Sequence, residues 1–465
     1  MSNTNQKKTK QKSMSLRSLL KRRGLHIHFV GVGGVSMYSL AVLSEKNGYT
    51  VSGSDMFVNE RCRLLELKGI PVFACHSEEN IGLAELIVYS HAIPEDNPER
   101  AAARLRGIPQ FSRAEYLGEL MLKYRERIGV SGTHGKSTTV AILDRIFTSS
   151  GRNPTVLSGA ELESGSPIRE GGETLIYEAC EYRESFLSFS PSVALALNLE
   201  LDHTDCYENI QQLSASFVKA LSRATRLAVI NLDDENLKRI YPEIKKKTDV
   251  VTFGQGAGAE YSYFINSFNE GGYRFSLSHF GSEIGRFELN VLGVHNVINA
   301  VAAIVLSLEC GVPIEQVREA VAAFSGIPRR LECIGSRHGR KIYYDYAHHP
   351  TEISAGINTL KMLHKEPLTV VFKPHTFTRT LALWEDFCTS LSLADRVLLT
   401  DIYPAREKPI EGVNSKRLAE DIGRGAEYCP DPEVLSRLDS QHIKGPVVLM
   451  GAGDLDSVKY DIFNK

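Results

Sequence analysis

The residues with the clearest chemistry form one short loop, Gly132-Thr133-His134-Gly135-Lys136-Ser137. Glycines let a backbone approach phosphates closely, a lysine supplies a cation to the terminal phosphates, and a serine hydroxyl can ligate Mg²⁺. The strict motif has a glycine where this chain has Val130. An apolar run before the loop and a helical pattern after it nevertheless supply the strand and helix that such a loop requires. The loop therefore predicts a site for a nucleoside triphosphate.

Further polar residues follow two predicted strands of the same segment. Glu178 comes directly after the run 175–177, and Asp202 and His203 come shortly after the run 193–197. The carboxyl ends of parallel strands converge on one crevice, where a carboxylate can reach Mg²⁺ and a histidine can hold metal or phosphate. A surface glutamate and a structural histidine are the alternatives. The convergence of all these groups with the loop favours a Mg²⁺–triphosphate site.

A second glycine-rich turn lies near the start of the chain. Residues 26–30 predict a strand, the turn Gly31-Val32-Gly33-Gly34-Val35-Ser36 follows, and a helical pattern continues to Asn47. Asp55 stands about 20 residues further on, where dinucleotide-binding folds place an acid. Ser36 occupies the position of the third glycine. The turn therefore predicts a phosphate-containing ligand, which could be NAD(P), another nucleotide or a nucleotide sugar.

Two loops near the C-terminal end are polar and rich in cationic side chains. Asp345-Tyr346-Ala347-His348-His349-Pro350 follows a predicted strand, and His375 and Arg379 follow another. Ring stacking or helix capping could explain each histidine alone. Two such loops after two strands favour an edge that faces an anionic substrate.

The elements that position these groups follow an α/β pattern in three segments. The expected boundaries are a basic tail at 1–24 and domains at 25–124, 125–327 and 328–465. Ser112 and Glu115 have the spacing of a capping box, and 296–308 predicts a helix. Residues 261–292 alternate in polarity, which predicts an antiparallel meander beside an otherwise parallel sheet. We therefore expect three α/β domains, the central one with a mixed sheet.

The composition is that of an ordinary globular protein. The chain has 465 residues, of which 42% are apolar and 24% charged, and its formal net charge of −2 gives no support for a nucleic-acid surface. Eight cysteines are scattered without metal-ligand spacing, which favours reduced thiols in the cytoplasm. No apolar run has the length of a membrane span, so we expect no stable membrane association.

Taken together, the motifs resemble the Mur ligases of peptidoglycan synthesis, in the branch that adds L-alanine. The resemblance spans almost the whole chain and rests on ordered motifs at Gly31–Met37, Ser52–Asp55, Gly132–Ser137, Glu178–Arg183, Asn198–His203, His295–Asn299, Arg329–Arg330, Asp345–Pro350, Pro374–His375, Arg379 and Gly451–Asp454. It implies a Rossmann-like domain for a UDP-sugar, a central P-loop ATPase domain and a Rossmann-like domain for the amino acid. ATP would convert the carboxylate of UDP-N-acetylmuramate to an acyl phosphate, which the amine of L-alanine attacks.

The resemblance also assigns roles to residues. ATP would be bound by Gly132, Thr133, His134, Gly135, Lys136, Ser137, Thr138, Asn296, Asn299, Arg330 and Asp345. Two Mg²⁺ ions would be held by Ser137, Glu178 and His203. The UDP-sugar would be bound by Gly31, Gly33, Gly34, Val35, Ser36, Met37, Asp55, Ser90 and His91. The amino acid would be bound by Tyr346, His348, His375 and Arg379, and catalysis would depend on Lys136, His203, His348 and Arg379.

Departures from the family pattern leave some roles open. Thr376 stands where many alanine-adding ligases have arginine, and the roles of Cys180 and Arg183 are not assigned. Other branches carry a carbamoylated lysine where this chain has Phe217, as expected for the alanine-adding branch, although Lys219 lies nearby. The expected partners are the two small-molecule substrates, with the chain a monomer or weak dimer. The alternatives are a recycling ligase that attaches a preformed peptide to the same sugar nucleotide, and a nucleotide sensor without activity.

Overall fold

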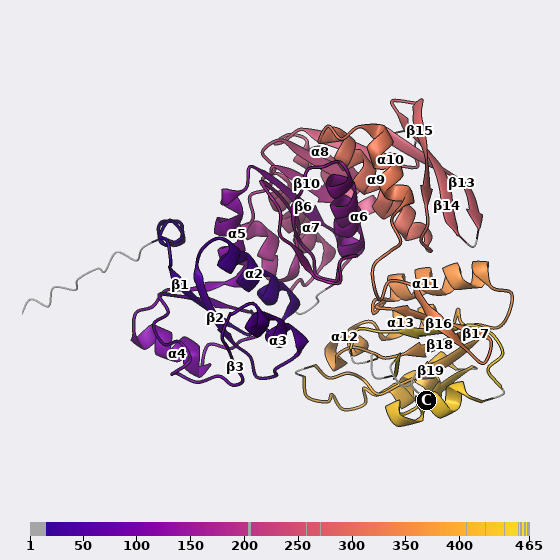
Figure 1. Ribbon diagram of the computed structural model, residues 1–465. Helices are drawn as coiled ribbons and strands as arrows, with labels where there is room; N and C mark the ends of the chain where they lie inside the picture. Colours follow the sequence, from indigo (N-terminus) through magenta and orange to yellow (C-terminus); the bar gives the residue numbers. More distant parts are fainter. Residues whose placement is uncertain are drawn as a thin grey trace, which may run out of the picture.

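The computed structural model describes residues 15–202, 206–256, 258–269, 271–405, 407–423, 425–440, 442–453, 455, 458–459 and 462. Figure 1 shows three successive α/β units, with the N-terminal unit in indigo, the central unit above it and the C-terminal unit in orange and yellow. The predicted fold class is confirmed. No helix among the described residues has the length and apolar character needed to cross a membrane.

The first unit contains a parallel five-stranded sheet in the order β3-β2-β1-β4-β5. Its elements are α1 (Leu16–Leu19), β1 (His26–Val30), α2 (Val35–Lys46), β2 (Thr50–Ser54), α3 (Glu60–Leu67), β3 (Val72–Phe73), β4 (Leu86–Tyr89), α4 (Pro98–Leu105), β5 (Gln110–Ser112), α5 (Arg113–Leu120) and the 3₁₀ helix Met121–Lys123. The predicted capping box is confirmed, because both reciprocal bonds between Ser112 and Glu115 are present.

The expected basic tail, residues 1–24, includes residues that belong to the first unit. Leu16, Leu19 and Leu20 are buried in the hydrophobic core of the first unit. The Ser15 hydroxyl accepts a hydrogen bond from the backbone N–H of Ser18 and caps this short helix. The leucines lie among the tail's basic residues, so the charges conceal a short segment that packs on the domain.

The central unit contains a ten-stranded sheet in the order β15-β14-β13-β12-β11-β10-β6-β9-β7-β8. Its elements are β6 (Glu126–Ser131), α6 (Lys136–Ser149), β7 (Thr155–Leu157), β8 (Ile168–Arg169), β9 (Thr174–Glu178), the 3₁₀ segment Tyr182–Ser188, β10 (Val193–Ala196), α7 (Ile210–Leu221), β11 (Leu227–Asn231), α8 (Glu235–Ile244), β12 (Val250–Gly254), β13 (Tyr261–Asn269), β14 (Gly272–His279), β15 (Ser282–Leu289), α9 (Val294–Glu309) and α10 (Ile314–Ala322). The predicted meander is confirmed as β13–β15, whose neighbouring strands pair antiparallel. The strands that carry the expected site residues, β6, β9 and β10, pair in parallel.

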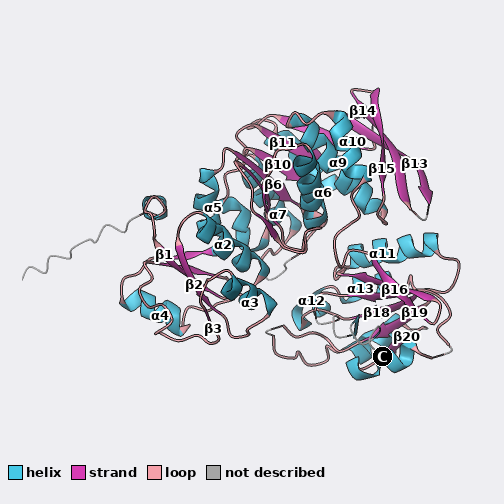
Figure 2. Ribbon diagram, in the orientation of Figure 1, coloured by secondary structure: helices cyan, strands magenta, loops and turns pink. Residues whose placement is uncertain are grey.

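The third unit contains a six-stranded sheet in the order β16-β17-β21-β18-β19-β20. Its elements are β16 (Glu332–Arg337), β17 (Arg340–Asp345), α11 (Pro350–Leu363), β18 (Thr369–Phe372), α12 (Phe377–Ala382), α13 (Trp384–Leu391), β19 (Arg396–Leu399), α14 (Ser415–Ile422), β20 (Ala426–Tyr428), the 3₁₀ helix Asp431–Glu433, α15 (Val434–Leu438) and β21 (Val447–Met450). Figure 2 shows helices on both faces of this sheet. Strand β16 was not predicted from the sequence, and it pairs antiparallel with β17 at the edge of the sheet.

The first and central units are packed together through helix α5. One hydrophobic core runs from the first unit onto one face of the central sheet, and it includes Tyr116 of α5 and Phe186 of the segment 182–188. A Cβ atom added to Gly118 of α5 would lie only 2.2 Å from the backbone oxygen of Ser188. Glycine is therefore required for this close approach, which fixes the first unit against the central sheet.

Candidate active site

The glycine-rich loop 132–135 connects β6 to α6, as predicted. Gly132 and Gly135 have backbone φ angles of +147° and +82°, a region that side chains other than glycine rarely adopt. A Cβ atom at Gly135 would lie 2.3 Å from Asn299 Oδ1. Ser137 and Thr138 occupy the buried first turn of α6, so the loop presents the N-terminus of a 14-residue helix to a ligand.

Lys136 is paired with a carboxylate that the sequence analysis did not single out. Its Nζ lies 3.2 Å from Glu181 Oε2 and 3.1 Å from the backbone oxygen of Thr133, and it also donates to the backbone oxygen of Gly132. Burial favours the neutral amine, but the Glu181 carboxylate outweighs it and raises the pKa of Lys136. The lysine therefore keeps its charge inside the site.

The loop is held by the segment that follows β10. The backbone N–H of His134 donates to Asn198 Oδ1 at 2.8 Å, and Asn198 Nδ2 donates to the backbone oxygen of His134 at 3.1 Å. Thr133 Oγ1 donates to the backbone oxygen of Glu200 at 3.1 Å and accepts from its N–H at 2.9 Å. These four bonds fix the loop without using its glycine N–H groups. His203, a predicted metal ligand, lies outside the described residues.

Glu178 ends β9, beside the strand that leads into the glycine-rich loop. Val130 of β6 is its register partner. One carboxylate oxygen of Glu178 accepts from the backbone N–H of Gly159 and, at 3.3 Å, from Ser158 Oγ. Hydroxyl and carboxylate oxygens are the ligand types that Mg²⁺ prefers, so Ser137 and Glu178 fit the expected ion in chemistry.

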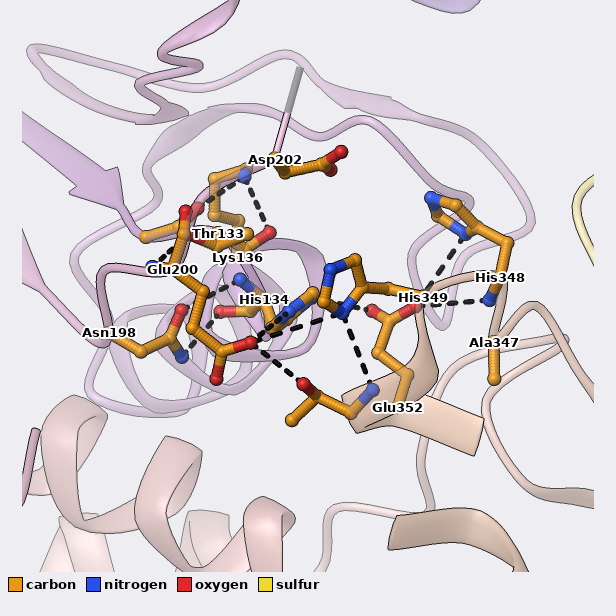
Figure 3. Close-up of polar contacts among 12 residues, drawn as sticks. Thr133, His134, Lys136, Asn198, Glu200, Asp202, Ala347, His348, His349 and Glu352 are labelled. Atoms are coloured by element: carbon orange, nitrogen blue, oxygen red, sulfur yellow. Dashed lines mark hydrogen bonds and ion pairs between the residues drawn. The ribbon is translucent and has the colours of Figure 1, made fainter. Parts of the chain in front are cut away.

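The third unit reaches the glycine-rich loop through the start of α11. Glu352 Oε1 accepts from His134 Nδ1 at 3.2 Å and lies 3.5 Å from Arg330 Nη1. Thr351 Oγ1 donates to Glu200 Oε2 at 2.8 Å. Figure 3 shows His134, Glu200, His349 and Glu352 gathered at this junction. Residues from two predicted domains therefore meet beside the expected triphosphate.

Glu352 is buried among cationic groups, and this controls its charge. Burial alone raises the pKa of a carboxyl group, but His134, His348 and Arg330 together hold the pKa of Glu352 well below its usual value. The pKa of the neighbouring Asp345 is instead raised to about 7, mainly by burial and against the opposing effect of Arg330. Two nearby acids thus have opposite protonation preferences.

The asparagines expected to contact adenine are buried on α9. Asn299 Nδ2 donates to Asn296 Oδ1 at 3.1 Å, and Asn296 Nδ2 donates to the backbone oxygen of Leu292 at 2.7 Å. Asn299 also lies against Gly135. In this structure the two asparagines therefore support the phosphate loop at Gly135.

The first glycine-rich turn is closed by the acid predicted to bind a ligand. Asp55 Oδ2 accepts from the backbone N–H of Gly33 at 2.9 Å. The backbone oxygen of Gly33 accepts from Asn59 Nδ2 at 3.0 Å and from Arg61 Nε at 2.8 Å. Gly34 caps α2, and Val35, Ser36 and Met37 form its first turn. Asp55 thus stabilises the turn itself.

The loop after β4, which contains Ser90 and His91, meets the central unit at His91. Arg183 Nη1 approaches the backbone oxygen of His91 at 3.5 Å. Burial and then the positive charge of Arg183 lower the pKa of His91. Arg183, whose role the sequence left open, therefore links the central segment 182–188 to the expected UDP-sugar loop.

The residues expected to bind the amino acid lie near one another in the third unit. The ring of His375 lies 6.4 Å from that of His348, and the ring of His348 lies 5.5 Å from that of Tyr346. Burial and then Arg379 lower the pKa of His375 to about 4, so this ring is neutral. Arg379 Nη2 donates to Asp202 Oδ1 at 3.3 Å. Arg379 therefore links this group to the central unit.

Thr376, which departs from the expected pattern, and Phe217, which stands where other branches carry a lysine, both have structural roles. Thr376 has a φ of +64° and caps α12, its hydroxyl accepting from the Arg379 N–H. Phe217 is fully buried, with its ring 5.2 Å from that of Phe186, while Lys219 is exposed. Phe217 thus fills a hydrophobic position on α7.

Similarity to known proteins covers almost the whole chain. Three family models match in order: the Mur ligase family catalytic domain at residues 26–125, the Mur ligase middle domain at 130–307 and the Mur ligase glutamate ligase domain at 329–453. A UDP-N-acetylmuramate–L-alanine ligase of Caldicellulosiruptor saccharolyticus is 39% identical, with 92% of this chain and 96% of that protein covered. One of Aquifex aeolicus is also 39% identical, with 94% and 97% covered.

Solved structures agree with these sequence comparisons. A UDP-N-acetylmuramate–alanine ligase of Thermotoga maritima superposes with a TM-score of 0.80 at 29% identity, covering 94% of this chain and 98% of that one. A murein peptide ligase of Psychrobacter arcticus superposes with a TM-score of 0.70 at 22% identity over 94% and 98% of the two chains, and this likeness concerns the fold. The chain belongs to the Mur ligase family.

Proposed function

We propose that this chain is an ATP-dependent ligase that joins L-alanine to the carboxylate of UDP-N-acetylmuramate in peptidoglycan precursor synthesis. The observation that carries the proposal is the junction at the glycine-rich loop. There Lys136 pairs with Glu181 of the central unit, and Glu352 of the third unit pairs with His134 of the loop. Arg379 of the third unit pairs nearby with Asp202, on the segment after β10. The alanine ligases named above, similar along their whole length, favour this activity over the peptide-recycling and sensor alternatives.

The proposed chemistry has two steps. A carboxylate oxygen of the sugar nucleotide attacks the γ-phosphorus of ATP, and the bond to ADP breaks. The amine of L-alanine then attacks the carbonyl carbon, a carbon–nitrogen bond forms, phosphate leaves and the amine loses a proton. Activation is needed because a carboxylate is a poor electrophile until phosphate becomes its leaving group.

We assign the first step to the central unit. Lys136 stabilises charge on the transferring phosphoryl group, and the loop Gly132–Ser137 with Thr138 surrounds the phosphates. Ser137 and Glu178, with His203, would hold Mg²⁺, which when bound screens the negative charges of the phosphates. We place adenine near Asn296 and Asn299, with Arg330 and Asp345 closing from the third unit.

We assign the substrates to the two flanking units. The N-terminus of α2, with Gly31, Gly33, Gly34 and the residues to Met37, would bind the UDP diphosphate, with Ser90 and His91 beside the sugar. Tyr346, His348, His375 and Arg379 would position the amino acid and the acyl phosphate. Arg379 supplies positive charge there, because the pKa values of His348 and His375 are both lowered by burial.

Phosphate release with UDP-N-acetylmuramate and either L-alanine or a preformed tripeptide tests the proposal. We expect release with L-alanine. Activity with the tripeptide alone would identify a recycling ligase, and binding of both nucleotides without release would identify a sensor. Lys136→Ala should abolish turnover but leave UDP-sugar binding intact, whereas retained turnover would contradict the assignment of the loop.

A further inference from the structure

The side chains of His134, Glu200 and His349 converge where the central and third units meet. Each offers one ligand atom, and these three atoms all lie within 4.8 Å of one another. His134 and Glu200 belong to the central unit, while His349 immediately precedes α11 of the third unit. None of the three was expected to bind a metal, and they are distinct from Ser137, Glu178 and His203.

The spacing of these atoms is compatible with an ion pair and also with ligands around one shared ion. His134 Nε2 lies 3.4 Å from Glu200 Oε2 without forming a hydrogen bond. His349 Nδ1, which accepts a hydrogen bond from the Thr351 N–H, lies 3.9 Å from the same oxygen, and the buried Nε2 of the ring has no hydrogen-bond partner. Ligands about 2.1 Å from a tetrahedral Zn²⁺ ion lie roughly 3.4 Å apart. The separations therefore approach those of ligands around one ion.

The surrounding hydrogen bonds orient His134 and Glu200 for binding a metal ion. The His134 Nδ1–H donates to Glu352 Oε1 at 3.2 Å, so the ring directs Nε2 toward Glu200. A carboxylate on the second ring nitrogen is the usual partner of a metal-binding histidine, because it fixes the orientation of the ring and raises its basicity. Thr351 Oγ1 orients the Glu200 carboxylate from the third unit. Each group is thus held by the neighbouring domain.

Burial and chemistry limit which ion would fit. The side chains of His134 and His349 are only 14% and 8% exposed, and that of Glu200 is 36% exposed. Two imidazoles and one carboxylate suit a first-row transition ion such as Zn²⁺ better than Mg²⁺, which prefers oxygen ligands. The exposed side of Glu200 leaves an approach for the ion and for a water molecule as fourth ligand.

We propose that His134, Glu200 and His349 form a binding site for a transition-metal ion of the Zn²⁺ class, which joins the phosphate-loop domain to the third domain. An ion there would connect positions 134, 200 and 349 across the domain junction. It would hold the start of α11 against the phosphate loop. The site would be independent of Mg²⁺ and would exist before any substrate binds.

Titration calorimetry of the full chain with Zn²⁺, in excess Mg²⁺ and without nucleotides, tests the proposal. We expect one tight site, weakened more than about 100-fold by His349→Ala and about 10-fold by Glu352→Gln, which removes only the supporting carboxylate. Glu200→Gln should also weaken binding while keeping the size of the side chain. His442→Ala, at an exposed histidine of the same domain, and Glu178→Gln, at the proposed Mg²⁺ site, should leave the affinity unchanged.

Co²⁺ provides a second measurement. We expect the intense visible absorption of a four-coordinate nitrogen–oxygen site in the natural chain and in His442→Ala, and its loss in His349→Ala and Glu200→Gln. Circular dichroism distinguishes lost ligation from lost folding. Absence of Zn²⁺ binding, or equal affinity in the natural chain, His349→Ala and Glu200→Gln, would overturn the proposal and leave the ligase assignment untouched.

Discussion

Lys136 Nζ lies 3.2 Å from Glu181 Oε2, so the lysine of the phosphate loop already has a buried counter-charge before a phosphate arrives. The side chain of Glu181 is only 2% exposed and that of Lys136 only 13%. Removing one member of a buried pair leaves the other charge uncompensated. Glu181 therefore stabilises the empty site, and phosphate must compete with it for the lysine.

Glu181→Gln should lower the free energy of unfolding of the ligand-free chain by about 3 kcal/mol, because Lys136 loses its buried partner. Saturating ATP should restore more stability to this variant than to the natural chain, because the phosphates replace the lost carboxylate. Chemical unfolding with and without ATP measures both effects.

Glu163→Gln is the matched control for this prediction. Glu163 pairs with Arg145 at 3.3 Å, but the arginine side chain is 38% exposed, so its loss should cost less than about 1 kcal/mol. Equal effects of the two substitutions would mean that the Lys136–Glu181 pair does not matter to stability.

Gly135→Ala should weaken ATP binding by at least about tenfold, a change of roughly 1.4 kcal/mol. The new Cβ would lie 2.3 Å from Asn299 Oδ1, and the φ of +82° adds backbone strain. Binding of the UDP-sugar should be unchanged. Calorimetry with each nucleotide measures the difference.

Two further variants locate the cause of this effect. Gly256→Ala is the control, because nothing lies within 4 Å of its added Cβ and its φ is not in the left-handed region. Combining Gly135→Ala with Asn299→Ala removes the clash but not the strain, so part of the ATP affinity should return. Unchanged ATP affinity in Gly135→Ala alone would show that the loop moves freely.

The sequence predicted the strands and loops of this fold better than the partners within the site. The strand at His26–Val30 and the strand–loop–helix around Gly132 followed from apolar runs, which report burial directly. Strand β16 was missed because its residues are mostly half-exposed, and an edge strand lacks a continuous apolar run. Local sequence patterns therefore predict buried strands more readily than strands at the edge of a sheet.

Long-range partners had no local signal. Glu181 contacts Lys136 across 45 positions and Glu352 contacts His134 across 218, so neither pairing is visible in spacing. Glu352 did have one cue, since it is an acid in the first turn after His349-Pro350. That position also suits an acid that stabilises the helix N-terminus, so the sequence could not distinguish this role from contact with another domain.

The contribution of Asp345 to the stability of the third unit should fall as the pH rises from about 4 to about 7. Burial raises the pKa of Asp345 to about 7 from an ordinary value of 3.8, so between these values the folded chain holds a proton that the unfolded chain has released. Two neighbouring charges act on the pKa of Asp345 in opposite directions. The positive charge of Arg330 lowers this pKa, and the negative charge of Glu352 raises it.

Asp345→Asn removes this titration while keeping the size of the side chain. We compare the free energy of unfolding of Asp345→Asn with that of the natural chain at each pH. This difference should favour the variant more at pH 8 than at pH 5, by on the order of a few kcal/mol. Urea unfolding at both pH values measures the change. The same difference in stability at pH 5 and pH 8 would mean that Asp345 titrates normally in the folded state.

Arg379→Gln should raise the KM for L-alanine by roughly 100-fold, which corresponds to the loss of about one strong charged hydrogen bond. His375 is neutral because burial and Arg379 lower its pKa to about 4, so the guanidinium provides the cationic charge for the amino-acid carboxylate. The KM for UDP-N-acetylmuramate should change little. Arg379→Lys should be intermediate, because it keeps the charge but loses the two-pronged geometry.

Arg396→Gln provides the control for this change within the same domain. Arg396 pairs with Glu427 at 2.7 Å, away from the histidines, so its loss should leave the KM for L-alanine unchanged. If Arg379→Gln instead raised the KM for ATP alone, the guanidinium would belong to the phosphates. Its contact with Asp202, on the segment after β10, makes this the sharpest competing assignment. Varying ATP and L-alanine independently therefore decides which anion Arg379 binds.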